Sequence, residues 1–332
     1  MLPEFIEKLL NPEKYDDSPS QLNLVQTHIS FVLISKDFVY KIKKPVNFGF
    51  LDFTTLEKRK FYCEKEIEYN SRLTPEIYEK VVEIRKKGDD YFFNGDGEIV
   101  EYAVKMKRFN EDNSLLNLLK NKKCDDGIFR NIAQKLVNFH NKYPAEISLA
   151  QKSIDNMKIT TDENFAQTEK YIGITIGKNA YNKLKNYTNK FYEEKESLLK
   201  KRIKDKRIKE CHGDLHLQHI IIDNNKILII DCIEFNDRFR IIDVANEIAF
   251  LSMDLDYNGY ENYSKLFVDY YVELSKDYEI YELLNFYKIY RAYVRGKVTS
   301  FLLDDIAISP EDKEKIKLRA KRYFELAESY LK

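Results

Sequence analysis

The densest group of reactive side chains is the segment CHGDLHLQH at residues 211–219, where three of the five histidines surround Asp214. A run of isoleucines follows at once, which is typical of a β-strand. A second acid, Asp231, comes at the end of the next apolar run. A tight hairpin between the two runs would bring both acids to one place, as a catalytic base and a metal ligand require.

The histidines of this segment allow one chemistry, a zinc site. His212, His216 and His219 are spaced by four and three residues, so a helix would place their imidazoles on one face. Such a site would serve a zinc-dependent hydrolase. Gly213 inside the segment and the strand directly after it argue against a helix of that length, and the hydrolase is therefore kept as an alternative.

The two acids allow a different chemistry, phosphoryl transfer to a hydroxyl group. Asp214, in the loop, would accept or orient the hydroxyl proton of the substrate. Asp231, at the end of a strand, would hold Mg²⁺ against the phosphates of a nucleotide. The sequence favours this chemistry over zinc, because a loop and a hairpin suffice to position the two carboxylates.

The first hundred residues predict strands around one helix. Alternating or continuous apolar positions, separated by turn residues, indicate the strands, and apolar positions among dense charges indicate a surface helix. We expect strands at 30–34, 38–43, 81–84, 91–93 and 99–106, and the helix at 54–73. These elements would form a β-rich N-terminal lobe over residues 1–107.

Residues 108–332 predict a helical lobe with one embedded hairpin. Apolar residues recur at spacings of three and four, which is typical of amphipathic helices. We expect helices at 114–119, 128–140, 164–172 and 180–203 and from residue 260 onward, with hairpin strands at 220–222 and 227–232. The fold class is therefore α+β, with two lobes and a ligand cleft between them.

Composition excludes several classes of protein. The chain has 332 residues, of which 43% are apolar, so it can bury a core and is not disordered. Lys and Arg together number 55, as do Asp and Glu, which removes the positive field of a nucleic-acid-binding or membrane-surface protein. No apolar run reaches membrane-spanning length and the four cysteines are scattered, so we expect a cytoplasmic protein.

The phosphoryl-transfer pattern resembles the aminoglycoside phosphotransferase and choline kinase branch of the protein-kinase-like superfamily. The shared features are HGD at 212–214, a metal position five residues after Asp214, a hairpin, and two apolar residues before Asp231. The resemblance covers nearly the whole chain and is nearest to the bacterial and archaeal aminoglycoside phosphotransferase family enzymes. It implies ATP and Mg²⁺ as cofactors, Asp214 as the catalytic base, Asp231 as a metal ligand and His212 as a buried brace.

One position departs from the family pattern. The second metal ligand is usually Asn, whereas this chain has His219 there, and imidazole prefers softer ions than Mg²⁺. The neighbouring Gln218 could supply an oxygen ligand instead. The departure motivates a second alternative, a nucleotide-binding regulatory protein with weak or no catalysis.

The resemblance also implies a phosphate clamp in the N-terminal lobe. Lys41 and Lys43 lie in the strand FVYKIK, where alternation puts both on one face, and either could contact the α and β phosphates. Lys41 is slightly favoured. Glu66, seven residues before the Leu that ends the helix, would be the acid that pairs with this lysine.

Four further groups of residues complete the expected site. Ser30 lies in the glycine-free loop expected to cover the phosphates, and Met106 lies in the connector expected to read the adenine edge. His216, Glu234, Arg291 and Arg295 are candidates for substrate contact. The expected reaction is transfer of the γ-phosphate of ATP to a hydroxyl of a small molecule, with neither nucleic acid nor membrane as a partner.

Overall fold

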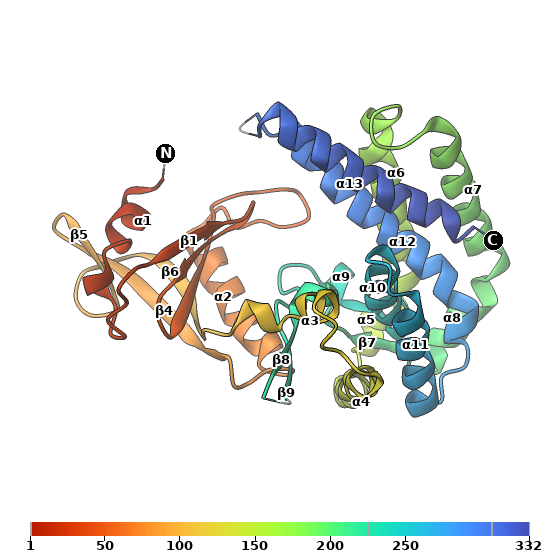
Figure 1. The fold of residues 1–332 in the computed structure, drawn as a ribbon, viewed down its shortest axis with the longest axis horizontal. Helices are drawn as coiled ribbons and strands as arrows, with labels where there is room; N and C mark the ends of the chain where they lie inside the picture. Colours follow the sequence, from red (N-terminus) through yellow and green to blue (C-terminus); the bar gives the residue numbers. More distant parts are fainter. Residues whose placement is uncertain (1, 225, 307, 332) are drawn as a thin grey trace. The chain divides into compact units, whose positions relative to one another are not determined.

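The computed structural model describes residues 2–224, 226–306 and 308–331, and the chain divides into two compact units (Figure 1). The sheet unit comprises Met1–Leu118 and His219–Asp237, and the helical unit comprises Leu119–Gln218 and Arg238–Lys332. This division differs from the expected boundary at residue 107. The hairpin that follows His219 belongs to the sheet unit because its side chains Ile221 and Leu228 share a core with the sheet.

The sheet unit is built on six antiparallel strands in the order β1-β2-β3-β6-β4-β5. Two of them, β2 and β3, have the bounds expected from the sequence. The strands are β1 (Asn23–Gln26), β2 (Ser30–Ile34), β3 (Phe38–Lys43), β4 (Tyr78–Lys87), β5 (Asp90–Phe93) and β6 (Glu98–Lys107). The short hairpin β8 (Ile220–Asp223) and β9 (Lys226–Ile229) completes the β-structure of the unit.

Alternation along β3 divides its side chains between two apolar cores. Tyr40 and Ile42 pack with helix α1 (Glu4–Leu9) on one face of the sheet. Val39 packs on the other face with residues of helix α2 (Leu56–Asn70). Lys41 and Lys43 therefore point from the same face as Val39, toward α2.

Helix α2 begins at a capped residue and holds the hairpin at its other end. The Thr55 hydroxyl accepts a hydrogen bond from the Lys58 amide, which satisfies one of the first free amides of the helix. Past the C-terminal end, the Thr74 hydroxyl bonds both the amide and the carbonyl of Ile229 in β9. The helix and the hairpin are thus joined at the point where β9 ends.

The helical unit contains one pair of short strands among its helices. The helices are α4 (Asp126–Lys142), α5 (Ile147–Gln151), α6 (Ser153–Thr168), α7 (Lys178–Glu194), α8 (Glu196–Lys204), α9 (Asp237–Arg240), α10 (Val244–Tyr257), α11 (Glu261–Ser275), α12 (Ile280–Phe301) and α13 (Pro310–Ser329), while α3 (Leu115–Lys120) spans the division between the units. The strands β7 (Ile208–Glu210) and β10 (Ile241–Asp243) pair with each other.

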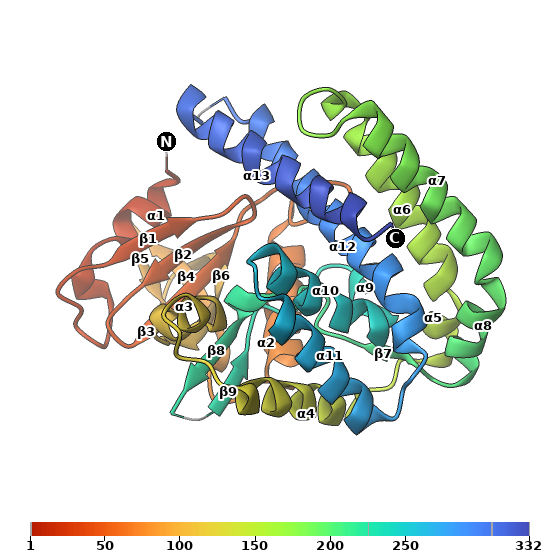
Figure 2. The same cartoon turned by 45° about the vertical axis from the view of Figure 1, so that its right-hand side comes forward.

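Helix α10 forms the centre of the helical unit, with α11, α12 and α13 packed against it (Figure 2). Every residue from Val244 to Leu255 is buried, so this helix is packed on all its faces and not on a single apolar stripe. Asp243 begins the helix, and its carboxylate accepts a hydrogen bond from the Ala245 amide. Glu247 is a charged residue inside this buried helix and needs partners there.

Several elements of the helical unit differ from the sequence expectations. Helix α6 begins at Ser153 and ends at Thr168, where a helix over 164–172 was expected, and α10 was not expected. The expected helix over 180–203 is two helices, α7 and α8, which meet at Lys195. The β7–β10 pair was not expected, because strands of three residues carry no readable alternation. Within the described ranges, no helix is long and apolar enough to cross a membrane.

Candidate active site

The charged centre of the sheet unit is a lysine held between two acids. The Lys41 Nζ lies 2.6 Å from Asp231 Oδ1 and 2.8 Å from Glu66 Oε1. The Glu66 side chain is fully buried, whereas 46% of the Asp231 side chain is exposed. Lys41 therefore links a fixed helix carboxylate to a carboxylate that solvent or a ligand can reach.

The second lysine of β3 is enclosed by carboxylates. Lys43 donates to Glu66 Oε2 at 2.6 Å and to Glu234 Oε1, and its side chain is only 1% exposed. Its ammonium also lies 4.9 Å from the centre of the Phe53 ring, a cation–π distance. Both of its strong contacts are internal, which leaves Lys41 as the lysine that can exchange partners.

Burial and ion pairing oppose each other within this cluster. Burial acts to raise the pKa of Glu66, but Lys41 and Lys43 outweigh it and hold the pKa below its ordinary value. Burial raises the pKa of Glu234, and Lys43 only partly counters it. Burial lowers the pKa of Lys41, yet Asp231 and Glu66 raise it well above the ordinary value, so Lys41 stays a cation.

The sheet unit positions Asp231 through its backbone. Asp231 has φ of 64°, in the left-handed region that residues other than Gly adopt rarely. Its amide donates to the Tyr78 hydroxyl at 3.0 Å, and the next amide, of Cys232, donates to Asn70 Oδ1 at 2.8 Å. These side chains of β4 and α2 hold the turn that directs the Asp231 carboxylate toward Lys41.

The remaining expected residues of the sheet unit take different positions. His219 Nε2 lies 3.7 Å from Asp231 Oδ2, so it adjoins the acid expected to bind metal. Ser30 is buried, and its Oγ has no hydrogen-bond partner among the described residues. Met106 lies inside β6 and is paired in register with Val39 on one side and Tyr78 on the other.

In the helical unit, Glu247 holds the HGD loop. Its two carboxylate oxygens accept hydrogen bonds from the His212 amide at 2.6 Å and the Gly213 amide at 3.0 Å. Burial acts to raise the pKa of Glu247, but the neighbouring imidazoles of His140 and His212 outweigh it and keep the pKa below the ordinary value. A charged acceptor in a buried site makes these strong hydrogen bonds.

A second brace reaches the loop from helix α12. Arg291 donates from Nη1 to the Gly213 carbonyl at 3.0 Å and from Nε to Asn246 Oδ1 at 2.6 Å, and it is 5% exposed. A hydrogen bond within the loop adds to this support, because the Asp214 amide donates to His212 Nδ1 at 3.2 Å. Arg291 is thus occupied with supporting the loop, and Asp214 projects from the supported backbone.

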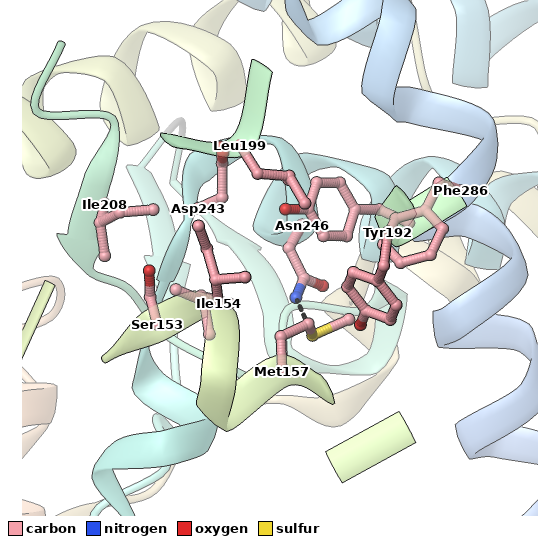
Figure 3. A pocket seen from close by; sticks show the side chains of 11 residues that line it. Ser153, Ile154, Met157, Tyr192, Leu199, Ile208, Asp243, Asn246 and Phe286 are labelled. Carbon is pink, nitrogen blue, oxygen red and sulfur yellow. Dashed lines mark hydrogen bonds between the residues drawn. The ribbon is translucent and has the colours of Figure 1, made fainter. Parts of the chain in front are cut away.

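Asn246, the partner of Arg291, borders a small cavity in the helical unit, which Figure 3 shows with Asn246 donating to the sulfur of Met157. The cavity has a volume of about 30 Å³ and is lined by apolar side chains together with Asp243, Asn246 and Ser153. This volume suits a buried water and not a metabolite. The cavity therefore belongs to the support of the loop.

The other expected substrate residues of the helical unit also lie near the loop. His216 Nε2 is 3.6 Å from Asp214 Oδ2, and its Nδ1 accepts from the Gln218 amide. Arg295 is largely buried, and the charge of Asp214 acts on it. A third of the Asp214 side chain is exposed, so its carboxylate is open to a ligand.

Several supporting residues were missed by the sequence analysis. Asn70, Thr74 and Tyr78 act on the hairpin from 153 to 162 residues away, and no local pattern indicates such contacts. The sequence does contain a signal for Glu247, because the otherwise mostly apolar run IIDVANEIAFL has two acids, Asp243 and Glu247. An acid in a buried helix is nearly always paired.

The cluster of the sheet unit fits a magnesium nucleotide. Two lysines and three carboxylates, namely Lys41, Lys43, Glu66, Glu234 and Asp231, sum to a charge of −1 when all are ionised. Asp231 is the exposed carboxylate of the cluster, and it is an oxygen ligand of the kind that Mg²⁺ prefers. Lys41 is then available for phosphate oxygens.

Comparison with curated proteins gives distant relatives. No family model matches the chain. An uncharacterised protein of Mycobacterium tuberculosis is 28% identical over 278 residues, and one of Mycobacterium bovis matches equally. The match covers 83% of this chain and 54% of each relative, so the chain spans about half the length of the curated relatives it matches.

Comparison with solved structures identifies the fold. A choline/ethanolamine kinase family protein from Mesorhizobium loti superposes with a TM-score of 0.52 at 9% identity, over 99% of both chains. An ethanolamine kinase of Plasmodium vivax gives 0.49 at 15% identity over 91% of this chain and 80% of that one, and a thermostable mutant of an aminoglycoside phosphotransferase gives 0.45 at 11% over 92% and 94%. The α+β, protein-kinase-like fold expected from the sequence is confirmed.

Proposed function

We propose that the chain is a kinase that transfers the γ-phosphoryl group of ATP to a hydroxyl of a small molecule. The observation that carries the proposal is the position of Lys41 between buried Glu66 and exposed Asp231. Phosphoryl transfer depends on positioning and neutralising phosphate charge, and a lysine beside a metal-binding acid does both. The proposal places the reaction in the cytoplasm, where ATP is found.

In this proposal the two lysines have different tasks. Lys41 releases Asp231 and contacts the α and β phosphates, while Asp231 becomes a ligand of Mg²⁺. Lys43 stays with Glu66 and Glu234 and keeps the helix acid in place. Bound Mg²⁺ supplies charge neutralisation on the β and γ phosphates.

Asp214 is the proposed catalytic base. The hydroxyl oxygen of the acceptor forms a bond to the γ-phosphorus, the bond from that phosphorus to the bridging oxygen of ADP breaks, and the hydroxyl proton passes to the Asp214 carboxylate. Glu247 and Arg291 hold the loop backbone on both sides of Gly213, which fixes where that carboxylate projects.

Thermal unfolding with and without ATP and Mg²⁺ tests the nucleotide site. A ligand at about 100 times its dissociation constant stabilises the native state by roughly 2.7 kcal/mol, which is a readable shift in Tm. We expect the shift in the wild type and a smaller one in Asp231→Asn. Asp237→Asn, an exposed acid of the same segment, is the matched control. No shift in the wild type would refute the site.

One observation favours the second candidate, a nucleotide-binding regulatory protein. His219 adjoins Asp231 where the resemblance expects an asparagine ligand, and imidazole is a poor ligand for Mg²⁺. ATP binding without ADP release, across a panel of hydroxyl compounds, would support this candidate against the kinase. The zinc hydrolase predicts stoichiometric zinc in the purified protein, which metal analysis measures.

A further inference from the structure

Three arginines gather around a pair of stacked tyrosines in the helical unit. The rings of Tyr257, at the end of α10, and Tyr323, in α13, lie 3.7 Å apart with planes 9° apart. The Arg322 guanidinium lies 4.7 Å from the Tyr257 ring, and the Arg295 guanidinium lies 5.7 Å from the Tyr323 ring. Arg319 joins them through its carbonyl, which accepts from the Tyr257 hydroxyl at 3.5 Å.

The charges of these arginines converge on the tyrosine pair. Burial raises the pKa of Tyr257, and Arg322, Arg319 and Arg295 all act in the opposite direction. Helix α12 packs against both α10 and α13, and the ring and guanidinium contacts bring side chains of all three helices together (Figure 2). We call Arg295, Arg319 and Arg322 the arginine cluster.

The arginine cluster lacks acidic partners. Elsewhere in the helical unit Arg202 and Arg238 form ion pairs with carboxylates. Within the described ranges no carboxylate lies within ion-pair distance of a cluster arginine, and the buried Nε of Arg295 has no hydrogen-bond partner. A buried guanidinium N–H without an acceptor is costly, and an anionic ligand would satisfy it.

The cluster is connected to the HGD loop through Arg295. Two acids act electrostatically on Arg295, first Asp214 and then Asp254. Asp254 Oδ2 in turn accepts from the Leu217 amide at 2.9 Å, in the segment that follows Asp214. Arg295 is therefore a cluster residue on which the charge of the proposed base acts, and Arg319 and Arg322 of the same cluster are exposed.

We infer that the arginine cluster binds the anionic group of the acceptor, so that the acceptor is a hydroxyl compound carrying a phosphate or a carboxylate. The inference names the substrate class. It rests on the proposed function, because the bound compound is an acceptor only if the chain is a kinase. Guanidinium groups bind phosphate and carboxylate through paired N–H donors, which suits this anchoring role. A cationic acceptor such as an amino alcohol would be repelled by the three arginines.

Isothermal titration of the full chain with sn-glycerol 3-phosphate, inorganic phosphate and ethanolamine, without nucleotide, tests the inference. We expect the wild type to bind the two anions and not ethanolamine. Arg319→Gln/Arg322→Gln should weaken anion binding at least tenfold, since each exposed arginine supplies charge-assisted hydrogen bonds. No anion binding at about 10 mM, or tighter binding of ethanolamine, would overturn the inference.

The matched control is Lys315→Gln/Lys317→Gln on the same helix. It also removes two positive charges, but both lysines pair with acids of α13 and lie outside the cluster. We expect anion affinity within twofold of the wild type. An equal loss of anion affinity in the control would show that the effect comes from net charge alone, and this would overturn the inference.

A further variant separates this inference from the proposed function. Anion binding that survives Arg319→Gln/Arg322→Gln but is lost in Lys41→Met would belong to the nucleotide site and would refute the cluster. ATP binding with Mg²⁺ should be unchanged in Arg319→Gln/Arg322→Gln. Failure of the wild type to bind ATP, with anion binding at the cluster intact, would refute the kinase proposal and leave the anion site standing.

Discussion

The ammonium of Lys41 lies 2.6 Å from the carboxylate of Asp231, although 190 residues separate them in the sequence. Two residues further along the same strand, the carboxylates that pair with Lys43, Glu66 and Glu234, are both buried. Both lysines emerge from one face of β3, and their surroundings alone distinguish them. Lys41 is poised to exchange an acid for a phosphate, whereas Lys43 is part of the structure that holds Glu66.

Lys41→Met and Lys43→Met should therefore fail in different ways. Lys41→Met should fold and lose ATP turnover by roughly 10²- to 10³-fold, as when one charge-stabilising donor is removed. Lys43→Met should lower the free energy of unfolding by roughly 3–5 kcal/mol, because it removes the ammonium that pairs with buried Glu234 and one of the two that pair with buried Glu66. Urea unfolding and ADP release measure the two effects. Equal stability losses would contradict the division of roles.

Glu247→Gln should reveal a carboxylate whose pKa is lowered by folding. Its native pKa lies below the ordinary glutamate value of about 4.3, so its contribution to stability is complete above that pH and is lost as pH falls through the native pKa. Near neutral pH, the free energy of unfolding of the wild type should exceed that of Glu247→Gln by roughly 1.5–3 kcal/mol. Urea unfolding should show this difference shrinking below about pH 4, and a constant difference would count against the lowered pKa.

Lys297 is predicted to titrate at unusually low pH. Its ammonium donates to the amide oxygens of Asn164 at 2.7 Å and Gln167 at 2.8 Å, and burial lowers its pKa to about 8. Between about pH 8 and the ordinary lysine value of about 10.4, the unfolded chain holds a proton that the native chain has lost. The stability of the wild type relative to Lys297→Met should therefore rise across this range, by up to about 3 kcal/mol.

The Lys297 prediction has a direct check. Nuclear magnetic resonance of ¹³C-labelled lysine reports the titration of the side chain, and Lys297→Met assigns its signal. A midpoint near the ordinary lysine value would show that the two amides solvate the charge fully, and the predicted rise in relative stability would then be absent.

Gly296→Ala should destabilise the contact between α12 and α13. A Cβ at Gly296 would lie 2.9 Å from the Phe324 ring, closer than side-chain atoms normally approach. Overpacking of this kind costs roughly 1–3 kcal/mol. Gly177→Ala is the control, since no neighbouring atom lies within 4 Å of its Cβ position, and it should change Tm little. A Gly296→Ala protein with wild-type Tm would show that Phe324 moves freely.

The sequence was most informative where structure is local. Strands β2 and β3 show alternation that fixes both their bounds and the shared face of Lys41 and Lys43. The same alternation could not rank the two lysines, because the difference comes from Glu234 and Asp231, nearly 200 residues away. Long-range burial decides their roles, and alternation carries no information about it.

The helical unit shows the same limit. The expected helix over 180–203 ends and restarts at Lys195, where no Gly or Pro marks a break. Arg291 was expected at the substrate as an exposed basic residue, but the structure uses it against the Gly213 carbonyl. The sequence of an amphipathic helix predicts that its basic residues are exposed. Only the structure shows that a distant segment covers one of them.

The most direct test of the kinase proposal is transfer of labelled phosphate. The protein would be incubated with γ-³²P-labelled ATP, Mg²⁺ and a pool of hydroxyl compounds that includes phosphates and carboxylates, and labelled products would be separated by mass and charge. We predict a labelled acceptor with the wild type and none with Asp214→Asn, which should still bind ATP. Product formed equally by Asp214→Asn, or ATP hydrolysis to free phosphate with every acceptor, would contradict the account.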